Sequence, residues 1–132
     1  MILGNGIDLL KVSRIKKILD KYGDSFLKKV FSDHEIKENK KKVFKINKLA
    51  KSFATKEAFV KALGTGFTKQ ISLKDISLKN EKNGKPYIDL SYRAQKYLKK
   101  NTPNGCKTII NVSISDEKDY VISNVIISFQ KK

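Results

Sequence analysis

The feature that most constrains the fold is a stripe of apolar side chains between residues 43 and 63. The stripe recurs at the spacing of one face of an α-helix, through Ile46, Leu49, Ala50, Phe53 and Val60. Gly64 follows it directly, at the position where a glycine commonly ends a helix. The pattern therefore predicts one long helix over residues 43–63 with a buried side.

The segments around this helix predict short helices and antiparallel strands. Strands are expected over residues 2–9, 71–78, 86–90, 108–115 and 120–129, and helices over residues 11–21 and 91–99. Asn83-Gly84 indicates a hairpin turn, and Ser32 and Glu35 form the S-x-x-E pattern of a capping box. We therefore expect an α+β fold, a single domain over residues 1–132 in which an antiparallel sheet packs on one long helix.

The net charge of +16, from 29 basic and 13 acidic residues, is typical either of a chain with a polyanionic partner, such as nucleic acid, an acidic protein or a phosphate-rich ligand, or of a solvated lysine-rich surface. The lysines are scattered, however, and Arg14 and Arg93 are the only arginines. Arginine is the side chain that most often reads bases, so its scarcity argues against nucleic-acid recognition. A basic RNA-binding module stands as the alternative to an enzyme, and no nucleic-acid partner is expected.

No segment predicts export or a membrane partner. The N-terminus lacks a basic region ahead of an apolar run, and no apolar run approaches the ~20 residues of a membrane-spanning helix. Cys106 is the only cysteine, so neither an internal disulfide nor a cysteine-rich zinc site can form. These features favour the reducing environment of the cytoplasm.

Two carboxylates stand at positions where packing does not explain them. Because an α-helix turns by about 100° per residue, Glu57 falls within the apolar stripe. A carboxylate there must be paired, protonated or metal-bound. An ion pair with Lys61, four residues on, is the structural alternative. Asp8 ends the first apolar strand, where Gly4 and Gly6 allow close approach of another backbone. A helix-capping or solvent-facing role is the alternative for Asp8.

Two carboxylates without a suitably placed histidine favour a hard cation such as Mg²⁺, which binds one or two carboxylates, waters and substrate phosphates. Lys61 lies one turn beyond Glu57 and could reach a phosphate. Gly64-Thr65-Gly66 follows and would let a phosphate-bearing ligand approach the backbone. Glycine after a helix is usually only a cap, so this loop is weak support by itself.

Four blocks in this order resemble the 4′-phosphopantetheinyl transferases of the short bacterial type, the holo-acyl-carrier-protein synthases. The most specific block is F-A-T-K-E-A-F-V-K-A-L-G-T-G over residues 53–66. The others are Gly6-Ile7-Asp8-Leu9, Asn83-Gly84-Lys85-Pro86-Tyr87 and Val112-Ser113-Ile114-Ser115. The resemblance spans nearly the whole chain and implies the fold of that family.

The resemblance implies an enzyme of fatty acid biosynthesis that moves the 4′-phosphopantetheine arm of coenzyme A onto a serine of apo-acyl carrier protein. The co-product would be adenosine 3′,5′-bisphosphate. Asp8 and Glu57 would hold Mg²⁺ against the pyrophosphate, and Lys61 would contact phosphate. Phosphoryl transfer of this kind depends on positioning and charge neutralisation. Glu57 and a metal-bound water are both candidates for the base that takes the serine proton.

The remaining substrate contacts also come from the resemblance. Gly64, Thr65 and Gly66 would border the nucleotide, together with Lys85-Pro86. Arg14, in the first helix, would face the acidic carrier protein. Short members of the family form homotrimers with active sites between subunits, whereas longer members fuse two similar halves, so a homotrimer is expected here.

Two positions depart from the family pattern. Asp116 stands where the family usually has a histidine that helps to hold the phosphates, and an aspartate would repel them unless it faced a cation. Either a nearby lysine such as Lys118 compensates this charge, or Asp116 turns away from the phosphates. Ser52 stands where an arginine is common. Both departures bear on coenzyme A affinity more than on the type of reaction. An inactive family member that only binds the carrier protein is therefore a further alternative.

Overall fold

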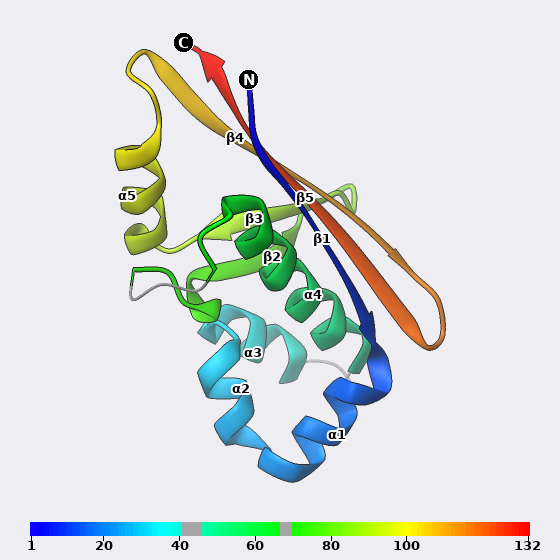
Figure 1. Ribbon diagram of the computed structural model, residues 1–132. Helices are drawn as coiled ribbons and strands as arrows, with labels where there is room; N and C mark the ends of the chain where they lie inside the picture. The colour runs from blue at the N-terminus through cyan, green and yellow to red at the C-terminus, as the bar shows by residue number, and fades with distance from the viewer. Residues whose placement is uncertain (41–45, 67–69) are drawn as a thin grey trace.

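The computed structural model describes residues 1–40, 46–66 and 70–132. A three-stranded antiparallel sheet has the order β1-β5-β4, and a separate hairpin pairs β2 with β3. The strands of the larger sheet are β1 (Ile2–Lys11), β4 (Cys106–Asp116) and β5 (Tyr120–Lys131), and those of the hairpin are β2 (Ile76–Asn80) and β3 (Pro86–Leu90). The two termini lie at the same end of the long sheet (Figure 1).

Five α-helices accompany the strands in the part of the chain that the structure describes. They are α1 (Val12–Tyr22), α2 (Asp24–Val30), α3 (Asp33–Lys40), α4 (Ile46–Leu63) and α5 (Tyr92–Asn101). The long helix α4 packs against β1 and β5, α1–α3 gather at one end of it, and α5 stands beside the start of β4 (Figure 1). The expected α+β fold, with an antiparallel sheet on one long helix, is confirmed. Residues 43–45 of the predicted helix lie outside the described residues.

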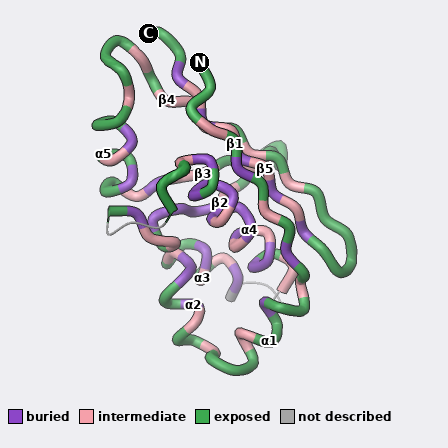
Figure 2. Tube along the Cα trace, viewed as in Figure 1, coloured by how far each residue is buried: buried purple, intermediate pink, exposed green. Residues whose placement is uncertain are grey.

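The buried positions form two apolar clusters on either side of the middle of α4. One cluster lies between α4, α5, the β2–β3 hairpin and β5, and the other between α4, α1 and α2. Alternate side chains of β5, from Val121 to Phe129, are buried against this core, as the period of two in a half-buried strand requires. Figure 2 shows these buried stretches running along α4 and β5.

The strand expected over residues 71–78 is wrong in its first half. A 3₁₀ turn occupies Leu73–Asp75, and the strand begins at Ile76. The cause is local, because the backbone N–H of Ser72 donates to Asp75 Oδ2 at 2.8 Å and the Ser72 hydroxyl donates to the same oxygen at 3.0 Å. A side chain that caps its own backbone competes with strand pairing. None of the helices in residues 1–40, 46–66 and 70–132 is long and apolar enough to cross a membrane.

Gly6 lets β1 lie directly on α4. A Cβ atom added at Gly6 would lie 1.8 Å from the carbonyl oxygen of Ala58, and one added at Gly4 would lie 1.9 Å from that of Ala62. The close approach expected from these glycines is thus confirmed. It also places the carboxylate of Asp8, two residues further along β1, beside the last turn of α4.

Gly6→Ala is expected to destabilise the fold by about 3 kcal/mol, because the atoms it would strike belong to the helix backbone and cannot rotate away. The free energy of unfolding in urea measures the effect. Asn5→Ala, at the neighbouring exposed position, serves as the control. A Gly6→Ala protein as stable as the control would contradict the close packing of β1 on α4.

Candidate active site

Asp8 and Lys61 meet across the contact between β1 and α4. Lys61 Nζ donates to Asp8 Oδ1 at 3.1 Å and to the carbonyl oxygen of Ile7 at 2.9 Å. Asp8 pairs with Ser123 in the middle of β1, and its side chain is only 16% exposed. The capping alternative for Asp8 is wrong, since Lys11 occupies the N-cap position of α1 and no side chain caps that helix. Asp8 therefore faces the helix that carries Glu57.

Glu57 is half-buried one turn before Lys61. Burial raises the pKa of Glu57, the negative charge of Asp8 raises it further, and the positive charges of Lys61 and Arg14 oppose these effects. The ion pair with Lys61 that the spacing allowed does not form, because Lys61 directs its ammonium group at Asp8. Within the described ranges, Glu57 has neither a hydrogen-bond nor an ion-pair partner. Two carboxylates and two cations therefore share one electrostatic environment.

The donor set at this site fits a hard cation that keeps part of its coordination sphere for water or substrate. Among the residues that the structure describes, no group of three or more Asp, Glu, His or Cys side chains could enclose a metal ion. Asp8 and Glu57 supply two carboxylates, the number with which Mg²⁺ is commonly held beside a phosphate-bearing substrate. The negative charges of Asp8 and Glu57 repel each other, and this repulsion contributes to the raised pKa of Glu57. A cation bound between the two carboxylates would relieve it.

The loop after α4 lies open beside this cluster. Gly64 and Gly66 have φ values of 74° and 66°, in the left-handed region that glycine adopts without steric cost. A Cβ atom at either glycine would meet nothing within 4 Å. Gly64 donates its N–H to the carbonyl oxygen of Val60 at 3.2 Å, which ends the helix as expected. The backbone of residues 64–66 is therefore accessible at the end of α4 that carries Lys61.

The charge of Arg14 acts on one of the two carboxylates, whereas no contact between the β2–β3 hairpin and either carboxylate is found among the described residues. Arg14 is exposed near the start of α1, close enough for its charge to act on Glu57. Lys85 is exposed in the hairpin turn, and Pro86 is the first residue of β3. No contact found among the described residues joins Lys85 or Pro86 to Asp8, Glu57 or Lys61. One copy of the chain thus assembles only part of the expected residue set.

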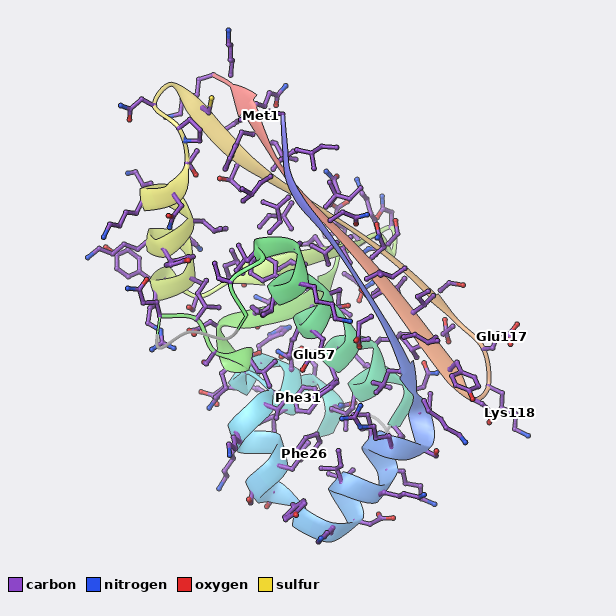
Figure 3. The ribbon with its side chains drawn as sticks, in the orientation of Figure 1. Met1, Phe26, Phe31, Glu57, Glu117 and Lys118 are labelled. Carbon is purple, nitrogen blue, oxygen red and sulfur yellow. The ribbon has the colours of Figure 1, made fainter. Side chains whose placement is uncertain are left out.

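Asp116 faces a cation, although a different one from that expected. Lys51 Nζ of α4 lies 3.4 Å from Asp116 Oδ1. Lys118 instead lies at the tip of the β4–β5 hairpin, far along the sheet from Glu57 (Figure 3). A nearby lysine thus faces Asp116, as one of the two alternatives expected, but this lysine is Lys51 and not Lys118. The chain nonetheless offsets the negative charge of this aspartate through Lys51.

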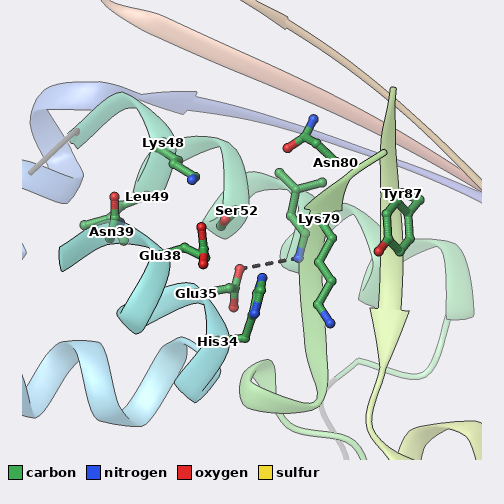
Figure 4. Close-up of a pocket in the computed structure, with 11 residues that line it drawn as sticks. His34, Glu35, Glu38, Asn39, Lys48, Leu49, Ser52, Lys79, Asn80 and Tyr87 are labelled. Atoms are coloured by element: carbon green, nitrogen blue, oxygen red, sulfur yellow. Dashed lines mark hydrogen bonds between the residues drawn. The ribbon is translucent and has the colours of Figure 1, made fainter. Parts of the chain in front are cut away.

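Ser52 is buried and lines a pocket of about 410 Å³ between α3, α4 and the β2–β3 hairpin (Figure 4). Its lining includes Lys48 and Lys79, and Lys79 is already bound to Asp89 at 2.6 Å. Neither Asp8 nor Glu57 lines this pocket. The position that is commonly arginine in the resembled family thus faces a hollow distinct from the two carboxylates.

Lys56 is a buried charge that the sequence interpretation missed. Its side chain is 0% exposed, and its ammonium group donates to Glu35 Oε1 at 2.6 Å, to the carbonyl oxygen of Leu73 at 3.0 Å and to that of Ile76. Burial lowers the pKa of Lys56, while the carboxylate of Glu35 raises it. Position 56 lies seven residues after Leu49 and three after Phe53, so the helical spacing itself could have placed it on the buried face.

Glu35 links this ion pair to the start of α3. The backbone N–H of Ser32 donates to Glu35 Oε1 at 3.0 Å, and the N–H of Glu35 donates to Ser32 Oγ at 3.3 Å. The expected capping box is thus confirmed. Because one carboxylate caps α3 and also binds Lys56, the buried ion pair connects α3, α4 and the segment leading into β2.

Residues 4–125 match the model of the 4′-phosphopantetheinyl transferase superfamily, and the chain belongs to that superfamily. It is accordingly a transferase, and the resemblance drawn from the four motif blocks is confirmed. The holo-[acyl-carrier-protein] synthase of Ehrlichia chaffeensis is 44% identical over 130 residues, which cover 96% of this chain and 97% of that protein. An RNA-binding module in place of an enzyme is therefore wrong.

Two solved structures resemble this chain closely. The holo-[acyl-carrier-protein] synthase of Neisseria meningitidis has a TM-score of 0.89 and 33% identity, covering 97% of this chain and 99% of that one. The Helicobacter pylori synthase, solved in complex with coenzyme A, has a TM-score of 0.78 and 31% identity, covering 94% and 99%. The family fold therefore extends over essentially the whole chain.

Proposed function

We propose that this chain transfers the 4′-phosphopantetheine arm of coenzyme A to a serine of an apo-acyl carrier protein. The observation that carries the proposal is the meeting of Asp8, Glu57 and Lys61 where β1 crosses α4. The names of the relatives support a carrier protein as acceptor, and the coenzyme A complex of the H. pylori synthase supports coenzyme A as donor. The cytoplasm and fatty acid biosynthesis are the setting we propose.

Asp8 and Glu57 would hold a Mg²⁺ ion. When bound, the ion would neutralise charge on the pyrophosphate oxygens of coenzyme A. Lys61 supports the same task, because its exposed ammonium group could exchange Asp8 for a phosphate oxygen. Gly64, Thr65 and Gly66 would border the nucleotide with their open backbone, and Arg14 would face the carrier protein. These roles rest on the cluster geometry and on the family motifs.

In the proposed reaction the serine oxygen attacks the phosphorus that carries the pantetheine arm. The bond from that phosphorus to the bridging oxygen of the pyrophosphate breaks, and adenosine 3′,5′-bisphosphate leaves with the bonding electrons. The serine proton passes to a base. Glu57 and a water on the bound Mg²⁺ are the two candidates for this base. Asp8 is the weaker carboxylate for the role, because it already accepts a hydrogen bond from Lys61.

The released nucleotide offers a direct test of this reaction. We expect chromatography to show one adenosine 3′,5′-bisphosphate for each carrier protein modified, and EDTA to abolish both products. Release of the nucleotide with EDTA present would contradict the metal dependence. Hydrolysis of coenzyme A without modification of the carrier would contradict the acceptor. Binding of the carrier without any turnover would support the inactive family member.

A homotrimer with active sites between subunits would bring Lys85 and Pro86 of one subunit to the carboxylates of another. The outward face of β1 supports such an assembly, because Ile2, Ile7 and Leu9 are 66%, 53% and 65% exposed in the single chain. Exposed apolar side chains that share one surface commonly mark an interface between proteins. Sedimentation analysis should therefore give three times the chain mass.

Co-assembly of two inactive variants tests whether the sites lie between subunits. Glu57→Gln and Lys85→Glu are each expected to lack most activity, whereas co-expressed mixtures should recover a fraction of it. Activity is recovered because a site formed between the two variants can take Glu57 from the Lys85→Glu chain and Lys85 from the Glu57→Gln chain. Mixtures no more active than the separate variants, in a protein that sediments as a trimer, would contradict shared sites.

Lys51→Ala tests the charge compensation of Asp116. Removal of Lys51 leaves Asp116 without the cation now 3.4 Å away, so we expect a severalfold rise in the KM for coenzyme A with little change in kcat. Asp116→His is expected to leave activity unchanged or to raise it, and should make the protein insensitive to Lys51→Ala. A large loss of activity in Asp116→His would mean that the aspartate has a role of its own.

A further inference from the structure

A second hollow lies away from the two carboxylates, between α5 and the start of β4. Its volume is about 800 Å³, within the range of pockets that hold small ligands. The helix α5 stands beside the first residues of β4 there, at the end of the sheet where both termini lie (Figure 1). None of the residues assigned to the transfer reaction lines this groove.

The floor of the groove offers apolar contacts. Leu90, Leu98 and Ile110 line it, and Tyr92 at its edge is 81% exposed. The side chains of Gln95, Thr102 and Thr108 are already bound within the protein. Gln95 donates to the carbonyl oxygen of Leu90 at 2.8 Å. Thr102 donates to the carbonyl oxygen of Leu98 and also contacts the Thr108 hydroxyl, each at 2.7 Å. A ligand on this floor would therefore gain mainly apolar contact.

The rim of the groove is cationic. Lys96 and Lys99 come from α5, and Lys132 follows β5. No Asp or Glu side chain is among the described residues that line the groove, and none of these three lysines forms an ion pair within the described part of the chain. Lysine side chains without an acidic neighbour in the groove would attract an anionic group placed beside them.

We propose that this groove binds an aliphatic chain with an anionic head group. The chain would lie on Leu90, Leu98 and Ile110, and the head would lie beside Lys96 and Lys99. We infer an anionic head group because the rim is cationic, and we infer an aliphatic chain because the floor is apolar. A carboxylate and a phosphate share this chemistry as head groups, and the experiment below separates them.

Cys106 makes the proposal directly measurable. It is the only cysteine of the chain, it is partly exposed, and it lines the groove. The rate of its alkylation by iodoacetamide, an uncharged reagent, reports whether the groove is occupied. We expect octanoate or octyl phosphate to slow this reaction at least fivefold with a saturable dependence, the more effective of the two identifying the head group. Octyl glucoside, with the same chain and no charge, should have little effect.

A pair of lysine variants separates the groove from general surface charge. Lys96→Glu with Lys99→Glu should abolish the protection of Cys106, whereas Lys100→Glu should retain it. Lys100 belongs to the same helix but does not line the groove. Circular dichroism would establish that both variants fold, and phosphopantetheine transfer should remain intact in both.

Three outcomes would overturn the proposal. Equal protection by octyl glucoside would mean that charge plays no part, and equal loss of protection in Lys100→Glu would mean that the effect is not local. Protection of Cys106 that grows with protein concentration in the absence of any ligand would mean that a second copy of the chain covers the groove. None of these results depends on whether the chain modifies a carrier protein.

Discussion

Glu57→Gln is expected to lower the rate of phosphopantetheine transfer by at least about 100-fold while the protein remains folded. Glu57 is half-buried and has no hydrogen-bond partner among the described residues, so the change removes one negative charge without removing a structural contact. Asp8→Asn should have a similar effect on transfer. The initial rate at saturating coenzyme A and carrier protein measures both losses.

Metal binding provides the second measurement on the same variants. Wild-type protein should bind Mn²⁺, a spectroscopic stand-in for Mg²⁺, in a way that electron paramagnetic resonance detects, and Glu57→Gln should bind it at least tenfold more weakly. Glu117→Gln, at the tip of the β4–β5 hairpin (Figure 3), removes a carboxylate away from the site and is the matched control. Near-normal transfer in either Asp8→Asn or Glu57→Gln would contradict the assignment of the two carboxylates.

Lys56→Met is expected to destabilise the fold by about 3–5 kcal/mol, because it leaves Glu35 buried without its cation. The same change also removes a donor from the carbonyl oxygens of Leu73, in the turn before β2, and of Ile76, the first residue of β2. The three elements that meet at Lys56 would thus lose their shared contact. Urea unfolding followed by circular dichroism measures the change in the free energy of unfolding.

Two further variants identify the source of that loss. Lys56→Met combined with Glu35→Gln removes both charges, so it should be less destabilised than the sum of the two single variants. Lys74→Met breaks an exposed ion pair with Asp33 at 4.0 Å, and we expect it to change stability by less than about 1 kcal/mol. Equal stability of Lys56→Met and Lys74→Met would contradict the importance of the buried pair.

The sequence predicted those elements whose boundaries depend on local signals. Pro86 begins β3 and Ser91 caps α5, with the Ser91 hydroxyl accepting the N–H of Ala94 at 3.2 Å. The strand expected from residue 71 failed for a related reason. Ser72 and Asp75 bind each other's backbone and form a turn, and an apolar alternation pattern does not reveal this competition.

The candidate site was only partly predictable for a different reason. The motif spacing identified Asp8, Glu57 and Lys61, but which carboxylate Lys61 binds is set by the approach of β1 to α4, over a separation of 53 residues. The position of Lys56 on the buried face was readable from helical spacing. Its partner Glu35 was not, because it lies 21 residues away on another helix. Tertiary contacts, rather than periodicity, decide such pairs.

The most direct test of the proposed function is the intact mass of an apo-acyl carrier protein after incubation with this protein, coenzyme A and Mg²⁺. We predict a gain of one phosphopantetheine group on the carrier and no gain when EDTA is present. An unchanged carrier mass with folded, trimeric protein, tested against several carrier proteins, would contradict the proposed transfer activity.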